Sequence, residues 1–145
     1  MSDLQSLYQQ VILDHAREKH GYGLREGAAA SSHQYNPTCG DEVTVGVHPD
    51  ADGRIHAISW EGHGCSISTA SASLLSDLVH DTERAELTAS IAAFRELMQS
   101  KGALEGDEEL LGDAVALAGV SRYVTRVKCA MLPWVALEDA LLKSA

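Results

Sequence analysis

The 145-residue sequence has little cysteine, little basic charge and few aromatic side chains, and the first two scarcities each exclude a class of protein. Three cysteines cannot build a disulfide framework, because one thiol always remains unpaired, so metal or thiol chemistry is the better expectation. Eleven basic against 21 acidic residues give a net charge of −10. This balance argues against sequence-independent binding to nucleic acid, which needs clustered lysine and arginine. We therefore expect no nucleic acid partner.

Long apolar runs are also missing. No run reaches the roughly 18–20 residues that cross a bilayer, and residues 1–7 lack the basic and then apolar pattern of a secretory signal. We expect no membrane partner and a cytoplasmic location. The length predicts a single domain over residues 1–145, and a chain of this size can bury a core without the help of disulfides.

Helical spacing of apolar residues predicts an amphipathic first helix and a largely helical second half. The first helix is expected over residues 2–17, with Ser2 and Gln5 as a capping box. Residues 19–32, rich in Gly, Ala and Ser, are expected to form a loop. The later helices are expected over residues 67–80 (with Ser66, Ser68 or Thr69 as the cap), 84–99, 110–117 (ended by Gly119), and from about 122–128 to 142, where Pro133 should kink or restart the last helix.

Two alternating segments, residues 42–48 and 54–61, predict an antiparallel hairpin around the turn 49–53. The order of helix, strands and further helices is typical of an α+β fold. A hairpin returns the chain to its starting point. Residues 39–41, before the first strand, should therefore lie beside Cys65, after the second.

The three cysteines and Asp41 form the candidate metal site. Cys39, Cys65 and Cys129 with this carboxylate would complete a tetrahedral donor set for Zn²⁺. Cys65 stands at the expected start of a helix, whose N-terminal partial charge favours thiolate. Cys39 lies in an Asn-Pro-Thr-Cys-Gly-Asp loop, which makes it the ligand that we expect to swing.

Other interpretations of the same residues stay open. A lone cysteine is often a small buried apolar residue, and Cys129 reaches the site only if the last helix packs there. His63 is two residues from Cys65 and is a rival ligand. Arg126 and Lys128 stand close to Cys129 in sequence and are candidates to contact anionic sulfur or a partner.

Four segments resemble a known family: residues 8–15 (YQQVILDH), 36–41 (NPTCGD), 62–73 (GHGCSISTASAS) and 119–130 (GVSRYVTRVKCA). They are similar to SufU, the zinc-bearing branch of the IscU-like iron–sulfur assembly proteins, and the resemblance covers nearly the whole chain. It implies a SufU/IscU-like fold, a small antiparallel β-sheet with helices packed on it.

The resemblance also implies a function. Cys39, Asp41, Cys65 and Cys129 match the family's zinc ligands. The implied activity is zinc-dependent acceptance of persulfide sulfur from a pyridoxal-phosphate cysteine desulfurase of the SufS type, which the acceptor thereby activates. Cys39 is the implied acceptor, freed when a histidine of the desulfurase takes its place on zinc. A downstream iron–sulfur scaffold is a possible further partner.

Two features favour the SufU branch over the scaffold branch. The scaffold branch has His immediately before the last cysteine, where this chain has Lys128, and residues 102–120 resemble the SufU insertion. One departure concerns the turn after the first helix: the family has a Pro-Arg-Asn type turn, and this chain reads Arg-Glu-Lys-His-Gly-Tyr-Gly over residues 17–23.

Two alternative functions use the same cysteines. The chain could be a scaffold on which a transient iron–sulfur cluster forms, because such clusters are held by thiolates. It could also be a structural zinc module that only binds a partner. Metal content and cluster reconstitution would separate these functions from sulfur transfer.

Overall fold

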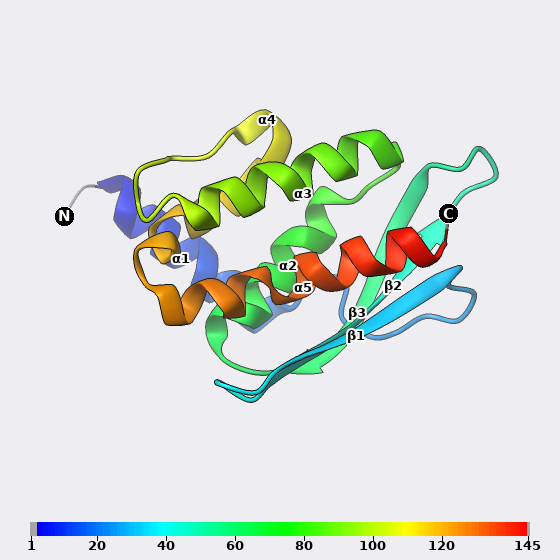
Figure 1. Ribbon diagram of the computed structural model, residues 1–145, viewed down its shortest axis with the longest axis horizontal. Coiled ribbons are helices and arrows are strands. Elements are labelled where there is room, and N and C mark those ends of the chain that lie inside the picture. Colours follow the sequence, from blue (N-terminus) through cyan, green and yellow to red (C-terminus); the bar gives the residue numbers. More distant parts are fainter. Residues whose placement is uncertain (1–2, 145) are drawn as a thin grey trace.

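The computed structural model describes residues 3–144, and in residues 3–5 only the backbone, so the capping box of Ser2 and Gln5 lies outside what it describes (Figure 1). A helix, a three-stranded sheet and a set of further helices follow one another. In chain order the elements are α1 (Asp3–Glu18), β1 (Ala30–Asn36), β2 (Asp41–Pro49), β3 (Ile55–His63), α2 (Ser66–Leu78), α3 (Arg84–Gln99), α4 (Glu108–Leu111), the 3₁₀ segment η1 (Gly112–Arg122) and α5 (Val124–Lys143).

The predicted hairpin is confirmed as β2 and β3. They pair antiparallel with Val45 opposite Trp60, and the register shifts between His48 and Pro49. Strand β1 adds to the other edge of β2 in the order β1-β2-β3. The pair Asn36–Asp41 closes the turn between β1 and β2, so Cys39 lies in that turn.

Strand β1 corrects the end of the loop predicted over residues 19–32: the loop is confirmed over residues 19–29, and the strand begins at Ala30. Its sequence, Ala-Ser-Ser-His-Gln-Tyr-Asn, carries no β-branched residue and only one aromatic, so it gives no strand signal of the usual kind. The inward positions are polar, because Ser32 and Asn36 are the buried residues. The strand forms because β2 offers it a hydrogen-bonding edge and α5 covers it.

Helices cover one face of the sheet, with α2 and α5 nearest to it and α3 further out (Figure 1). The inward face of β2 supplies Val43, Val45 and Val47, as the alternation predicted, and all three are buried. Further from the sheet, the rings of Phe94 and Trp134 stack with centroids 4.1 Å apart. This core joins α3 to α5 and fixes the helix that carries Cys129.

Two helix boundaries differ from prediction. Helix α5 runs without a restart through Pro133, which is buried in its middle. The expected helix over residues 110–117 is instead α4 followed by the long 3₁₀ segment η1, which continues past Gly119 to Arg122. Small residues make up much of this segment, and Ala114 and Ala116 pack inward, which lets it lie close to the core.

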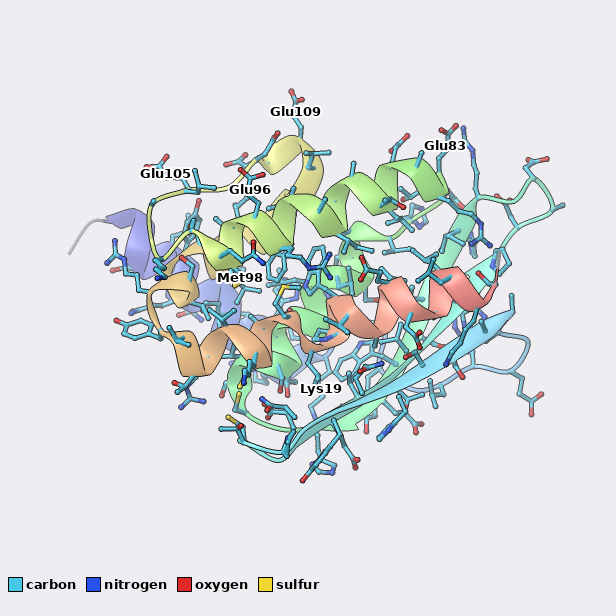
Figure 2. The ribbon with its side chains drawn as sticks, viewed as in Figure 1. Lys19, Glu83, Glu96, Met98, Glu105 and Glu109 are labelled. Atoms are coloured by element: carbon cyan, nitrogen blue, oxygen red, sulfur yellow. The ribbon has the colours of Figure 1, made fainter. Side chains whose placement is uncertain are left out.

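The outer side of the molecule is acidic. Glu96, Glu105 and Glu109 point outward from α3, the segment that precedes α4, and α4, while Met98 is directed into the interior (Figure 2). None of the helices in residues 3–144 has the length and apolar character that crossing a bilayer requires.

Ser71 links the helix after the hairpin to the helix of Cys129. Its hydroxyl donates to the Ala130 carbonyl at 2.6 Å and accepts from Trp134 Nε1 at 2.9 Å, and the residue is fully buried. Ser71→Ala would leave the Ala130 carbonyl and Trp134 Nε1 without this hydrogen-bond partner in the interior. We therefore expect a loss of about 1–3 kcal/mol in the free energy of unfolding.

Urea unfolding at fixed metal content measures this loss. Ser76→Ala is the matched control, since Ser76 lies on the same helix, is half-buried and makes no hydrogen bond through its side chain within the described residues. Equal stabilities of the two variants would contradict the assigned role of Ser71.

Candidate metal centre

Three of the four predicted ligands converge where the β1–β2 turn meets α5. Sγ of Cys39, a carboxylate oxygen of Asp41 and Sγ of Cys129 all lie within 4.8 Å of one another. The two sulfurs are 3.6 Å apart. The register explains the convergence: Asp41 opens β2 beside the turn, and α5 lies across β1 and β2, which brings its second turn over that end of the sheet (Figure 1).

Asp41 is the buried anchor of this group. Its residue is 0% exposed. Oδ1 accepts a hydrogen bond of 2.8 Å from the backbone N–H of Cys65, while Oδ2 is buried and has no hydrogen-bond partner among the described residues. A buried carboxylate oxygen without a partner is costly unless a cation or a donor compensates it. The site therefore has an unfilled requirement for positive charge.

Cys65 lies next to this group but its thiol is not one of the three converging atoms. It is the N-cap residue of α2, and its Sγ is 4.0 Å from Ser68 Oγ. The hairpin does bring residues 41 and 65 together, through the bond from the Cys65 amide to Asp41. The cap predicted at Ser66, Ser68 or Thr69 is instead Cys65, which makes no side-chain cap bond. Its role as fourth ligand stays a prediction.

The two converging thiols have opposite exposures. Cys129 is fully buried and Cys39 is exposed. Burial raises the pKa of the Cys129 thiol far above its usual range, and the proximity of Asp41 and Cys39 adds to the shift. Asn36, at the end of β1, also faces this sulfur, with Nδ2 3.9 Å from it. Without a cation Cys129 is a neutral thiol, and a divalent cation would favour its thiolate.

Arg126 is the basic residue beside the thiols. It lies one turn before Cys129 on α5 and is exposed. The neighbouring thiols, Cys65 first and then Cys129, raise the pKa of the Arg126 guanidinium, because their ionised forms would be stabilised by its charge. Lys128 is also exposed, but within residues 3–144 it makes no hydrogen bond or ion pair. The structure thus distinguishes Arg126, which lies beside the thiols, from Lys128, which has no such interaction. The sequence alone does not show this difference.

His63, the rival ligand, is engaged elsewhere. Its Nε2 lies 2.8 Å from Glu42 Oε1, and His33 Nε2 lies 3.1 Å from the other oxygen of the same carboxylate. Neighbouring residues of a strand point to opposite faces, so Glu42 holds His63 on the face away from Asp41. Sequence reasoning missed Glu42, although its position next to Asp41 in a period-2 strand was the available signal.

The donor chemistry fits Zn²⁺. Two thiols, a carboxylate with one unpaired oxygen and a third thiol nearby are the atoms that zinc accepts, and structural or exchangeable zinc sites are built from four of them. The three converging donor atoms, from Cys39, Asp41 and Cys129, already lie close together in this backbone conformation.

The comparison with known families now decides the relationship. Residues 7–130 match the family described as "NifU-like N terminal domain". The chain belongs to this family. The resemblance to its SufU branch is confirmed by 36% identity to the zinc-dependent sulfurtransferase SufU of Bacillus subtilis, over 98% of this chain and 94% of that protein.

Other members of the NifU-like family carry scaffold names. The chain is 39% identical to the iron–sulfur cluster assembly scaffold protein IscU of Streptococcus pyogenes, over 100% of this chain and 89% of that protein. A solved structure of a putative iron–sulfur cluster assembly scaffold protein for the SUF system from Fervidobacterium islandicum superposes with a TM-score of 0.83 and 34% identity, covering 94% of this chain and 98% of that one. These matches confirm the predicted fold of a small antiparallel sheet with helices packed on it.

Gly64 controls the position of Asp41. A Cβ at residue 64 would lie 2.2 Å from Asp41 Oδ1 and 2.6 Å from Ser68 Oγ. Gly64→Ala must therefore displace the carboxylate, and we expect the affinity for Zn²⁺ to fall by about 10–100-fold, as for other losses of ligand orientation.

Competition with a chromophoric chelator measures this affinity. Gly119→Ala is the matched control, because a Cβ there meets no atom within 4 Å and the backbone is not in the left-handed region. An unchanged affinity in Gly64→Ala would contradict the role of Asp41 in holding the ion.

Proposed function

We propose that this protein accepts persulfide sulfur on Cys39 from a pyridoxal-phosphate cysteine desulfurase of the SufS type and so activates that enzyme in iron–sulfur cluster biogenesis. The observation that carries the proposal is an asymmetry in the site. An exposed thiol, Cys39, lies 3.6 Å from a fully buried one, Cys129, and beside a buried carboxylate. A structural zinc module would gain nothing from exposing one ligand.

The proposed ligands of Zn²⁺ are Cys39, Asp41, Cys65 and Cys129. The unpartnered oxygen of Asp41 supports the presence of a cation. When bound, zinc keeps the thiols deprotonated near neutral pH. Asp41, Cys65 and Cys129 lie on the first residue of a strand, a helix N-cap and a buried helix turn, so they are held by secondary structure. Cys39 lies in the exposed turn between β1 and β2, so it is the ligand that can leave the ion without displacing a helix or strand.

The transfer step is a thiol–persulfide exchange. The Cys39 thiolate attacks the terminal sulfur of the desulfurase persulfide. A new S–S bond forms on Cys39, the S–S bond of the desulfurase breaks, and its electron pair leaves on the desulfurase cysteine, which becomes a thiolate again. No oxidant or reductant is consumed. The product is a Cys39 persulfide in the solvent-exposed turn, where a downstream scaffold could collect the sulfur.

A second function is favoured by the names of relatives. Members from Streptococcus pyogenes and Thermotoga maritima, 39% and 36% identical, are called cluster assembly scaffolds. Lys128 before the last cysteine supports the sulfur acceptor, because it stands where the scaffold branch has a histidine, which is a common metal ligand. Anaerobic reconstitution separates the two: a stable cluster that passes to an apo-protein would favour the scaffold.

Cys39→Ala tests the acceptor. After incubation with the cognate desulfurase and cysteine, mass spectrometry of alkylated peptides should find the persulfide on Cys39, and Cys39→Ala should no longer stimulate cysteine turnover. Thr38→Ala, a change in the same exposed turn, is the control and should behave like the wild type. Stimulation that survives in Cys39→Ala, or wild-type protein isolated without stoichiometric zinc, would overturn the proposal.

Arg126 and Lys128 should differ in their contribution. Arg126 lies beside the thiols and can stabilise anionic sulfur, whereas Lys128 makes no hydrogen bond or ion pair within the described residues. We expect Arg126→Ala to slow sulfur transfer several-fold with zinc content unchanged, and Lys128→Ala to slow it less. Rates at saturating desulfurase measure this difference. The reverse order would assign the anion contact to Lys128.

A further inference from the structure

A second cluster of metal-type side chains lies at the ends of α1 and α2. His15, in the last turn of α1, His20, two residues after that helix, and Asp77, in the last turn of α2, each place one ligand atom within 4.8 Å of the others. Asp77 Oδ2 is 2.8 Å from His20 Nδ1 and 3.9 Å from His15 Nε2. Two imidazole nitrogens therefore converge on one carboxylate oxygen.

The opposite nitrogen of each ring is held by another side-chain oxygen. His15 Nδ1 lies 2.7 Å from Ser73 Oγ, and His20 Nε2 lies 2.9 Å from Glu18 Oε1. Histidine ligands of metal ions characteristically bond through their second nitrogen to such oxygens, which fixes ring orientation and tautomer. Both rings of the cluster have such a supporting oxygen, Ser73 Oγ for His15 and Glu18 Oε1 for His20.

The backbone around His20 is fixed from both sides. Its N–H donates to Ser73 Oγ at 2.9 Å, and its carbonyl accepts from Trp60 Nε1 at 2.8 Å. The next residue is Gly21, with φ +77°, and a Cβ there would lie 1.9 Å from Ser76 Oγ. Only glycine allows this close approach of the turn to α2, so the position of His20 is built into the chain.

One nitrogen of the cluster has no hydrogen-bond partner. His15 is 8% exposed, and its Nε2, directed toward Asp77, makes no hydrogen bond within the described residues. Two helices end at this point, and their C-terminal carbonyls favour a positive charge. Asp77 and His20 are partly exposed, so water can complete the coordination of an ion.

We propose that His15, His20 and Asp77 form a second metal site, which takes a divalent transition ion such as Zn²⁺, Co²⁺ or Ni²⁺. Two histidines and one carboxylate with open positions suit these ions, whereas Mg²⁺ and Ca²⁺ require oxygen ligands. The site is distinct from the thiols and uses the turn, residues 17–23, in which this chain departs from the family pattern.

Protons compete with the ion. Hydrogen bonds to Asp77 and then to Glu18 raise the pKa of His20. The other ring that faces it is His15, with centroids 4.7 Å apart. A metal ion binds an imidazole nitrogen only in its unprotonated form. Its affinity should therefore rise as the pH is raised.

Cobalt titration of the full-length protein, stripped of metal with a chelator, tests the site. Cobalt bound to thiolates gives intense near-ultraviolet charge-transfer bands, and cobalt bound to histidine and carboxylate does not. We expect two equivalents to bind, one with and one without these bands. His20→Asn and Asp77→Asn should weaken only the second equivalent, by at least about tenfold.

A matched cluster supplies the control. His56 and His80 both contact Asp81, but through different oxygens, at 2.6 Å and 3.5 Å, and their rings are 6.0 Å apart. His56→Asn and Asp81→Asn remove the same chemical groups from an exposed position and should leave both equivalents intact.

Nuclear magnetic resonance of the unmodified protein provides a test that needs no variant. Zn²⁺ should shift the ring signals of His15 and His20 and leave those of His56 and His80 in place. Saturation of cobalt at one equivalent with thiolate bands, or an unchanged second equivalent in Asp77→Asn, would overturn the second site. Absence of the thiolate bands would instead count against the proposed function and leave this site supported.

Discussion

The burial of Asp41 is the constraint on which the arrangement of the candidate centre depends. A carboxylate with no exposure can persist only where its oxygens are compensated. One oxygen is compensated by the Cys65 amide, which ties the end of the hairpin to the start of α2. The other is left for a cation. Asp41 thus links β2 to the segment where β3 ends and α2 begins. Its unpaired oxygen calls for a cation, and the converging thiols could bind that same cation.

How firmly each ligand is held by the fold matters for the chemistry of the site as much as which donor atoms are present. Cys129 is fixed by a helix whose middle stacks Trp134 on Phe94 and bonds it to Ser71. Cys39 lies in a turn with an exposed side chain. If all donors were equally fixed, none could leave the ion without moving the helix or strand that carries it. A single donor in an exposed turn would allow exchange while the other donors keep their places, which is what the proposed sulfur transfer requires of a zinc site.

The sequence predicted the hairpin and the main helices, because period-2 and period-3.6 patterns report apolar faces. The hairpin placed residues 39–41 beside Cys65, whereas the inclusion of Cys129 rested on the family resemblance and on the packing of the last helix. Sequence reasoning failed at β1, whose inward residues are Ser32 and Asn36 and whose stability comes from its neighbours. It expected Pro133 to kink or restart the last helix, whereas α5 continues through this buried proline without a restart. The position of the Cys65 thiol depends on a side-chain rotation at a helix cap, which no pattern encodes.

The cluster of His15, His20 and Asp77 was not predicted from the sequence for a related reason. Its members come from two helix ends and a turn, and no sequence spacing indicates that they lie together. The geometry of α2 relates it to the thiols. Cys65 caps the start of α2 and Asp77 lies in its last turn, so twelve residues at 1.5 Å each separate them by about 18 Å. The helix dipole favours thiolate at the first end and a cation at the second. Because the separation exceeds the screening length of about 8 Å at physiological salt, the charge at one end has little effect on the other. The proposed sulfur transfer at Cys39 would therefore proceed whatever the occupancy of the histidine cluster, and a role for that cluster must be sought where the ends of α1 and α2 meet.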